Sequence, residues 1–327
     1  MRLRPRASAN PALLRQGRRN AATDAAFRGV TYAAALLVLA LVIAILVVLL
    51  VQAWPAFREF GWHFLTGRDW DPAHGRFSAL TSIFGTLVTS AIAMLIAVPV
   101  SFGIAVFVTE LAPAWLRQPV STAVELLAAI PSIIYGMWGL FVFAPLFAEY
   151  VQPWVIAHLG AWPIVGALFQ GPPMGIGVFT AGLVLAIMVI PFISAVIRDM
   201  FQLVPTVLKE SAYGVGCTTW EVVWHVVLPY TRVGVMGGIM LGLGRALGET
   251  MAVTFVIGNS HSLGASLFTA GNTISSTLAN EFTEAVGKTY TASLIALGLI
   301  LFVITFVVLA LAKLMLVRMA RRDGSSA

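Results

Sequence analysis

Six long apolar stretches constrain the fold of this chain more than any other feature of its sequence. Lipid offers no partners for backbone N–H and C=O groups, so a chain crosses a bilayer as a helix of roughly 20 apolar residues, which satisfies these groups internally. The stretches cover residues 30–51, 79–108, 120–147, 174–197, 233–257 and 290–313. The sequence therefore predicts an all-α integral membrane protein with six transmembrane helices.

Composition excludes a soluble fold. Hydrophobic residues make up 59% of the 327 residues and charged residues only 10%, and the mean hydropathy is +0.91. So few polar groups cannot cover a water-exposed surface. The first apolar stretch is too long for a signal peptide, and no small-residue cleavage site follows it, so we interpret it as a span. The single cysteine, Cys217, permits no internal disulfide and has no clustered metal ligands beside it.

The distribution of Lys and Arg predicts the orientation, because positively charged segments stay on the cytoplasmic side. Most of the 20 Lys and Arg residues lie in the N-terminal arm, in the second and third inner loops and in the C-terminal tail. We therefore expect a multi-pass protein of the cytoplasmic (inner) membrane with both termini in the cytoplasm. The expected organisation is a basic cytoplasmic arm at 1–29, a transmembrane domain at 30–316 with its core at about 79–313, and a cytoplasmic tail at 317–327.

The connecting segments carry weaker signals. Segment 148–173 has no Lys or Arg and is expected to lie along the outer surface, and segment 258–288 is rich in Ser, Thr and Asn and is expected to face water or a partner protein. Glu110 and Glu125 flank the second inner loop, and we interpret them as interfacial or helix-end carboxylates.

The third inner loop, residues 198–229, differs from the others. Its apolar residues form no run of 20, and Pro205 and Pro229 bracket what we expect to be a helix, a turn and a second helix outside the bilayer. Small and polar residues stand at defined spacings within it: Glu210, Ser211, Ala212, Gly216, Leu228 and Pro229.

These spacings resemble the EAA loop of ABC importer permeases, with Ser211 in place of the second small residue and Val226 in place of an Ile. In that family the loop forms a coupling helix that docks into the ATPase subunit. Small residues and a Gly would let a short helix lie close to another protein's backbone, and the following Pro would end it. An ordinary amphipathic inner loop is the alternative. No Walker A sequence is present, so the resemblance implies that ATP is hydrolysed by a separate chain.

A charged residue lies within the fifth predicted span. Arg245 follows Pro229 by about 16 residues, or about 24 Å of helix, which places it near mid-depth. An Arg there costs at least about 2.5 kcal/mol unless it faces a wet cavity or a counter-charge. Glu249, four residues later, would share its helix face. On the same face, Gly238 and Gly242 would admit another helix or a ligand.

Two interpretations of Arg245 remain open. A guanidinium presents a planar fork of donors that matches an oxyanion, so Arg245 and Glu249 are candidate residues of a substrate pathway. Alternatively, they form a buried ion pair that only holds helices together. Both roles are compatible with one another.

Longer stretches of the sequence resemble one particular type of ABC importer permease. The segments Glu125-LLAAIPSIIYGMWGLFVF, Gly244-RALGETMAVTFVIGN and Ser293-LIALGLILFVIT resemble the PstC-type phosphate permease subunits, with Ala270 where that family has Pro. The resemblance implies an ATP-driven importer that translocates inorganic phosphate by alternating access, with a PstA-like second permease, a PstB-like ATPase dimer and a PstS-like binding protein as partners. It also implies that this chain is no enzyme and binds no cofactor itself, ATP and Mg being held by the ATPase.

Two rival functions stay open on the sequence, and a third is disfavoured. One is a permease for another oxyanion, molybdate or sulfate. A second is a membrane scaffold for phosphate sensing, through which the anion does not move. An integral membrane enzyme is disfavoured, because the sequence shows no clustered nucleophile, base or metal ligands.

Overall fold

The structure is a computed structural model that describes residues 11–162 and 166–324. It divides into two parts, residues up to Gln52 and the part from Ala53 onward. In the first part the described residues belong to one helix, α1 (Pro11–Phe60), which continues through the expected boundary at residues 29 and 30. The first ten residues of the predicted arm and the last three of the predicted tail lie outside the described residues.

The second part is almost entirely helical, which confirms the predicted fold class. Apart from one isolated bridge between Asp71 and Arg76, its described regular elements are helices and single helical turns. After α1 they are α2 (His63–Thr66), η1 (Pro72–His74), α3 (Leu80–Val106), η2 (Phe107–Leu111), α4 (Ala114–Ala129), α5 (Ser132–Trp138), η3 (Gly139–Phe143), α6 (Ala144–Leu146), η4 (Phe147–Val151), α7 (Gln152–Leu159), η5 (Gly166–Phe169), α8 (Val178–Gln202), α9 (Thr206–Gly214), α10 (Thr219–Val222), η6 (Val223–Val227), α11 (Leu228–Leu247), α12 (Met251–Ile257), α13 (Ile274–Glu281) and α14 (Lys288–Gly324).

Six helical segments are long and apolar enough to cross a membrane, as predicted. They are Thr23–Phe60, Leu80–Leu111, Ser132–Leu159, Val178–Gln202, Thr219–Leu247 and Lys288–Arg318. The first extends beyond its predicted bounds, 30–51, at both ends. The third and the fifth are shifted along the sequence, and in both cases the cause is a break in the helix that the hydropathy of the sequence does not reveal.

The third span begins later than predicted because Pro131 interrupts it. Ile130 has an extended conformation, φ −67° and ψ 129°, as expected of a residue before proline. Helix α4 therefore ends at Ala129, and the apolar segment that follows runs from Ser132 to Leu159. The Tyr135 hydroxyl donates to the Leu127 carbonyl across the break at 2.9 Å. The start of the segment expected along the outer surface is thus a continuation of this helix.

The fifth span is displaced toward the inner loop. Pro229 was predicted to end the second helix of the inner loop, and this prediction is wrong. The helical segment runs from Thr219 through Pro229 to Leu247. The wide π-turn η6 directly precedes α11, and Pro229 lies in the first turn of α11, where its missing N–H is tolerated. The helix instead stops at Leu247, and α12 begins only at Met251.

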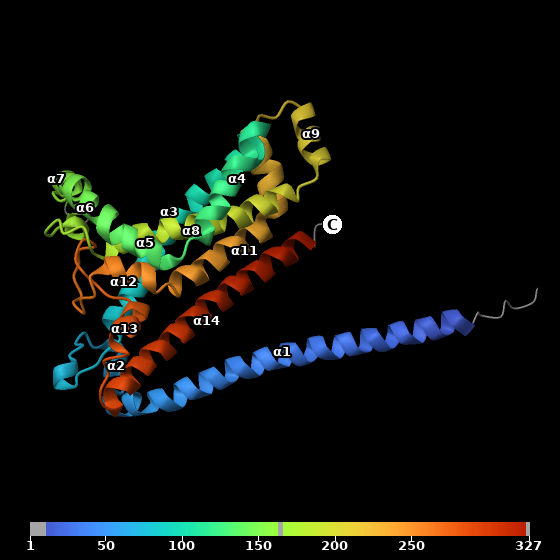
Figure 1. Cartoon of the computed structure of the whole chain (residues 1–327). Helices are drawn as coiled ribbons and strands as arrows, with labels where there is room; N and C mark the ends of the chain where they lie inside the picture. Colours follow the sequence, from blue (N-terminus) through green and yellow to red (C-terminus); the bar gives the residue numbers. More distant parts are fainter. Residues whose placement is uncertain (1–10, 163–165, 325–327) are drawn as a thin grey trace, which may run out of the picture. The chain divides into compact units, whose positions relative to one another are not determined.

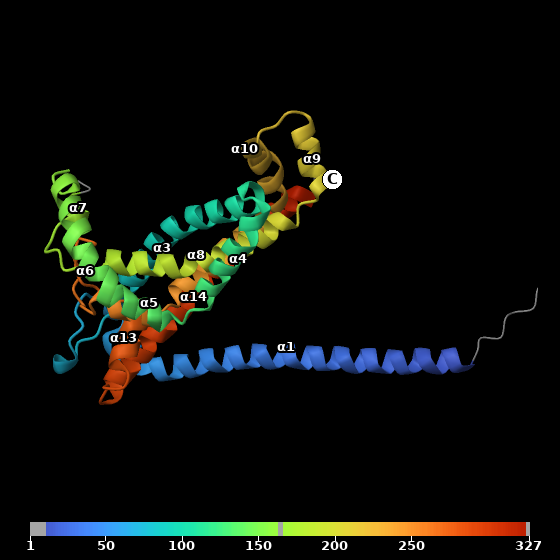
Figure 2. The same ribbon diagram turned by 45° about the horizontal axis from the view of Figure 1, so that its top comes forward.

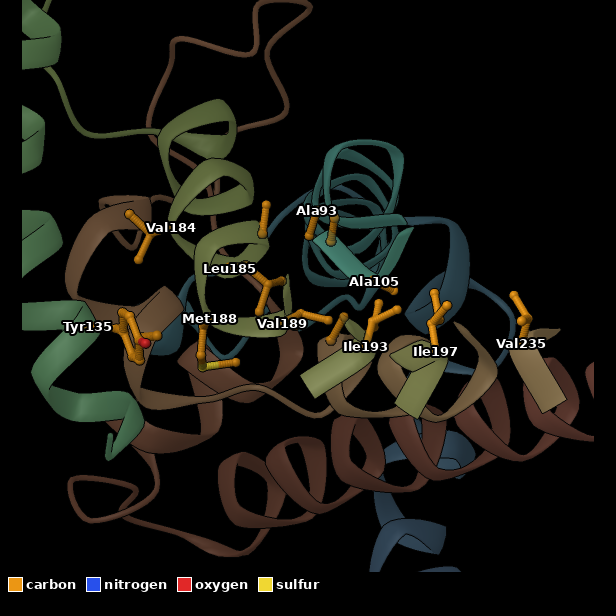
Figure 3. Packing of buried hydrophobic residues seen from close by; sticks show 14 of the residues in the cluster. Ala93, Ala105, Tyr135, Val184, Leu185, Met188, Val189, Ile193, Ile197 and Val235 are labelled. Carbon is orange, nitrogen blue, oxygen red and sulfur yellow. The ribbon is translucent and has the colours of Figure 1, made fainter. Parts of the chain in front are cut away.

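Helix α8 lies at the centre of the second part. Helices α3, α4 and α11 pack along it, and α14 packs on α11 (Figures 1 and 2). Its fully buried residues include Val184, Leu185 and Ile193, and Figure 3 shows them in one apolar cluster with Ala93 of α3 and Val235 of α11. Burial of each such side chain contributes about 1.5–3 kcal/mol relative to leaving it in water.

The loops separate to opposite ends of this helix bundle. Helices α9 and α10 lie at one end, and α7 and α13 lie at the other (Figures 1 and 2). The predicted inner loop 198–229 and the predicted outer loop 258–288 are therefore far apart, as the alternation of spans requires.

Candidate substrate pathway and coupling loop

Arg245 lies in the last turn of α11, beside the break in the fifth apolar stretch. Its side chain is exposed on the surface of this chain. The guanidinium carbon lies 5.7 Å from the centroid of the Phe192 ring of α8, a separation at which a cation is attracted to an aromatic face. Arg245 thus packs near an aromatic ring of a neighbouring helix.

Glu249 does not lie on the same helix face as Arg245, because α11 ends at Leu247. Its Oε1 instead accepts a hydrogen bond from the Ala252 N–H at 3.3 Å, in the first turn of α12, where a carboxylate satisfies a free N–H and opposes the helix dipole. Within the described part of the chain, no carboxylate lies within ion-pair distance of Arg245. The expected counter-charge is therefore engaged elsewhere.

The glycines of α11 admit a helix of the same chain. A methyl group on Gly242 would lie 2.5 Å from Cγ1 of Ile193, and one on Gly238 would lie 2.7 Å from Cγ1 of Val196. Both partners belong to α8. Of the two possibilities left open by the sequence, close helix packing is the one that these glycines serve.

The predicted coupling loop contains the expected helix, turn and helix. On α9, Glu210 and Ser211 are exposed and Ala212 is half-buried, with Ala212 packed against the apolar core. Leu228 and Pro229 lie elsewhere, in the first turn of α11. Five of the six motif residues therefore fall on two helices, and Gly216 lies in the turn after α9. Of the two helices, α9 stands clear of the bundle (Figure 1).

Gly216 has a conformational role that differs from the predicted one. Its φ is +94°, and a Cβ added there would meet no atom within 4 Å. The Gly216 N–H donates to the Tyr213 carbonyl at 3.0 Å and the Cys217 N–H to the Ala212 carbonyl at 3.1 Å, which is the Schellman pattern that closes a helix. Gly216 is needed for the left-handed turn after α9, and among the described residues no neighbouring backbone requires its small size.

Two ion pairs near this loop were missed by the sequence analysis. Lys209 Nζ lies 2.6 Å from Glu110 Oε1, and Arg198 Nη1 lies 2.6 Å from Glu125 Oε1. Glu110 and Glu125 are thus helix-end carboxylates, as interpreted, but each has a specific cationic partner. Each pair joins residues far apart in sequence, and no local pattern signals such a contact.

Part of the last predicted outer loop, which was expected to face water or a partner protein, is buried within this chain, while Val286 near its end is 87% exposed. Phe268, Asn272 and Thr273 are 1%, 2% and 3% exposed. The Asn272 amide donates to Ser82 Oγ of α3 at 2.9 Å and contacts His261 Nδ1 at 2.7 Å. Polar side chains of this loop bond to one another and to α3 through Asn272 Nδ2 and the Thr277 hydroxyl. Asn272 Oδ1 is buried without a hydrogen-bond partner among the described residues.

A carboxylate completes this network at the outer end. Glu281 of α13 accepts hydrogen bonds from Trp70 Nε1 at 2.8 Å and from the Tyr290 hydroxyl at 2.7 Å, and it contacts His261 Nε2 at 2.7 Å. Burial alone would raise the pKa of Glu281, but the bonds from His261, Tyr290 and Trp70 outweigh it and hold this pKa below its usual range. The network ties the first and last outer segments to α14.

Comparison with known proteins places the fold and sequence in a family. Residues 101–321 match the family described as binding-protein-dependent transport system inner membrane component. The chain is 59% identical over 308 residues to the phosphate transport system permease protein PstC of Mesorhizobium japonicum, with 94% of each chain covered. It is also 59% identical over 298 residues to the protein of the same name from Pasteurella multocida, covering 91% of this chain and 93% of that one.

Among solved structures, a bacterial alginate ABC transporter in complex with a periplasmic protein is similar in fold. Its TM-score is 0.58 at 19% identity, with 92% of this chain and 97% of that one covered. This likeness shows a shared fold. The family match and the relatives named as permease proteins, together with the six apolar helices, define a membrane-spanning transport subunit of the permease class. The chain belongs to the family of inner membrane components of binding-protein-dependent transport systems.

Proposed function

We propose that this chain is the permease subunit of an ATP-driven importer that moves inorganic phosphate across the cytoplasmic membrane by alternating access. Its relatives named as phosphate permeases, at 59% identity over nearly the whole chain, support the choice of phosphate. A second permease subunit would complete the pathway, an ATPase dimer would bind the coupling loop, and a phosphate-binding protein would deliver the anion from outside. Both termini would lie in the cytoplasm.

The position of Arg245 carries the proposal. Arg245 lies in the last turn of α11 and near the end of the fifth apolar helix. A guanidinium in apolar surroundings is expensive unless charge or water meets it, and the described part of this chain supplies an aromatic ring and no carboxylate. Because the fork of N–H donors is exposed at the surface of this subunit, a phosphate passing between two permease subunits would meet it.

The exposed helix α9 supports energy coupling to a separate ATPase. Because this chain contains no phosphate-binding loop of the Walker type, ATP and its Mg²⁺ would be bound by the partner and not by this chain. Closure of the ATPase dimer would displace α9, and the spans would follow.

Uptake of labelled phosphate by the complete reconstituted complex tests this function, with sulfate and molybdate as competitors. Arg245→Lys should impair uptake despite keeping the charge, because an ammonium lacks the planar donor fork, and Arg245→Gln should impair it further. Protein level and thermal stability are measured alongside. Glu249→Gln serves as the matched control, because its carboxylate caps α12.

The double variant Arg245→Gln, Glu249→Gln separates the two roles of Arg245. Because the structure shows no ion pair between these residues, the double variant should stay as inactive as Arg245→Gln alone. Recovered uptake together with recovered stability would mean that the guanidinium never served the anion. If sulfate or molybdate inhibited the uptake of labelled phosphate as strongly as unlabelled phosphate does, the assignment of phosphate as the cargo would be wrong.

A further inference from the structure

Helix α9 has few attachments to the rest of the chain. Val207 and Leu208 are 66% and 43% exposed, and Tyr213 is 42% exposed. Ala212 makes an apolar contact with the core. The polar contact is the ion pair of Lys209 with Glu110, in which the two side chains are only 17% and 6% exposed.

Glu110 belongs to the second span and not to the spans that flank the loop. It lies in η2 (Phe107–Leu111), which continues α3 without a break. Helix α3 in turn packs along α8, where the Ser101 hydroxyl donates to the Ile190 carbonyl at 3.0 Å. The pair therefore joins α9 directly to a helix that is distant in sequence.

Burial makes this contact a strong one. Breaking a largely desolvated ion pair by removing one partner leaves an uncompensated charge, whereas an exposed pair contributes little. Along the chain, α9 is connected to α8 only through residues 203–205 and to α10 through residues 215–218. Without the ion pair, α9 could pivot on these two short connections while α3 stayed in place.

We propose that Lys209 and Glu110 are positioning residues that make the second span move together with the coupling helix. The proposal rests on the proposed function, because it assumes that a partner ATPase displaces α9. Force applied to α9 then reaches α3 through the ion pair, and reaches α8 and α11 through the connections of the chain. Three spans are displaced together.

Transport per ATP hydrolysed, measured with the complete complex in proteoliposomes, tests the proposal. Glu110→Gln and Lys209→Gln should keep ATP hydrolysis but lower phosphate uptake per ATP several-fold. Lys209→Arg should retain the wild-type ratio, and the charge-swapped double variant Glu110→Lys, Lys209→Glu should recover it. Asp199→Asn is the matched control, because it removes an exposed carboxylate that pairs with Arg198 near the same end of α8.

A wild-type ratio in Glu110→Gln, or an equal loss in Asp199→Asn, would overturn the proposal. If the single variants fail to assemble, the charge-swapped variant decides, since an assembled but uncoupled swap contradicts it. Absence of phosphate uptake by the wild-type complex would count against the proposed function and not against the ion pair.

A distance measurement tests the ion pair whatever the cargo is. Spin labels on the exposed residues Leu111 and Val215 report the ends of η2 and α9. Their separation, measured by pulsed electron paramagnetic resonance, should be the same without nucleotide and with ATP in the wild-type complex, and should change in Glu110→Gln. A nucleotide-dependent separation in the wild type would show that the two segments move independently.

Discussion

Substitution of Gly242 by Ala should destabilise this chain, whereas the same substitution at Gly237 should not. Both glycines lie inside α11, so both variants gain the same helix propensity, about 0.5–1 kcal/mol. A Cβ at Gly242 would lie 2.5 Å from Cγ1 and 2.6 Å from Cδ1 of the fully buried Ile193, while a Cβ at Gly237 would meet nothing within 4 Å. Overpacking of this kind costs about 1–3 kcal/mol.

The helix contribution cancels between the two variants, so Gly242→Ala should be less stable than Gly237→Ala by about 1–3 kcal/mol. Unfolding of the purified chain in detergent, by heat or by a denaturing detergent, measures this difference. In an Ile193→Ala background the loss caused by Gly242→Ala should disappear, because the clashing atoms are gone. Equal stability of the two glycine variants, or an unchanged loss in that background, would refute the packing of α11 on α8.

Three other outcomes are expected. In a background without the native cysteine, Val286→Cys should react with an impermeant thiol reagent added outside cells and Val215→Cys should not, since these residues are 87% and 82% exposed on opposite sides; the reverse pattern would invert the topology. Gly216→Val should weaken ATPase association more than Gly216→Asn, which tolerates positive φ, and equal effects would contradict the turn. The fold lowers the pKa of Glu281, so the contribution of this carboxylate to stability is present above about pH 4.5 and is lost as pH falls through the lowered value. On acidification, the thermal stability of Glu281→Gln should therefore fall less than that of the wild type. An equal fall in both proteins would contradict the network.

The apolar stretches alone determined that this chain is helical and how many spans it has. Whether a backbone can cross lipid depends on the length and hydropathy of a continuous segment, which are local properties of the sequence. The spacing of Glu210, Ala212 and Gly216 likewise located the exposed helix α9, because a helix and its closing turn are local structures.

The sequence did not determine where the helices within these spans break. Pro131 and Pro229 are the same residue type in apolar surroundings, yet one ends a helix and the other lies in the first turn of a helix that follows a π-turn. The difference depends on whether neighbouring turns can accommodate the missing N–H, which the packing around each proline decides.

The partners of the charged side chains were decided only by the tertiary structure. Spacing placed Arg245 and Glu249 on one helix face, but the end of α11 separated them and left Glu249 to cap α12. Spacing gave no sign that Lys209 would meet Glu110 or that Asn272 would be buried against α3. Sequence alone determined which segments enter the membrane, because the free energy of transferring a segment from water to lipid depends on the residues of that segment. The charge contacts depend on which helices pack side by side, and that is a property of the whole assembled chain.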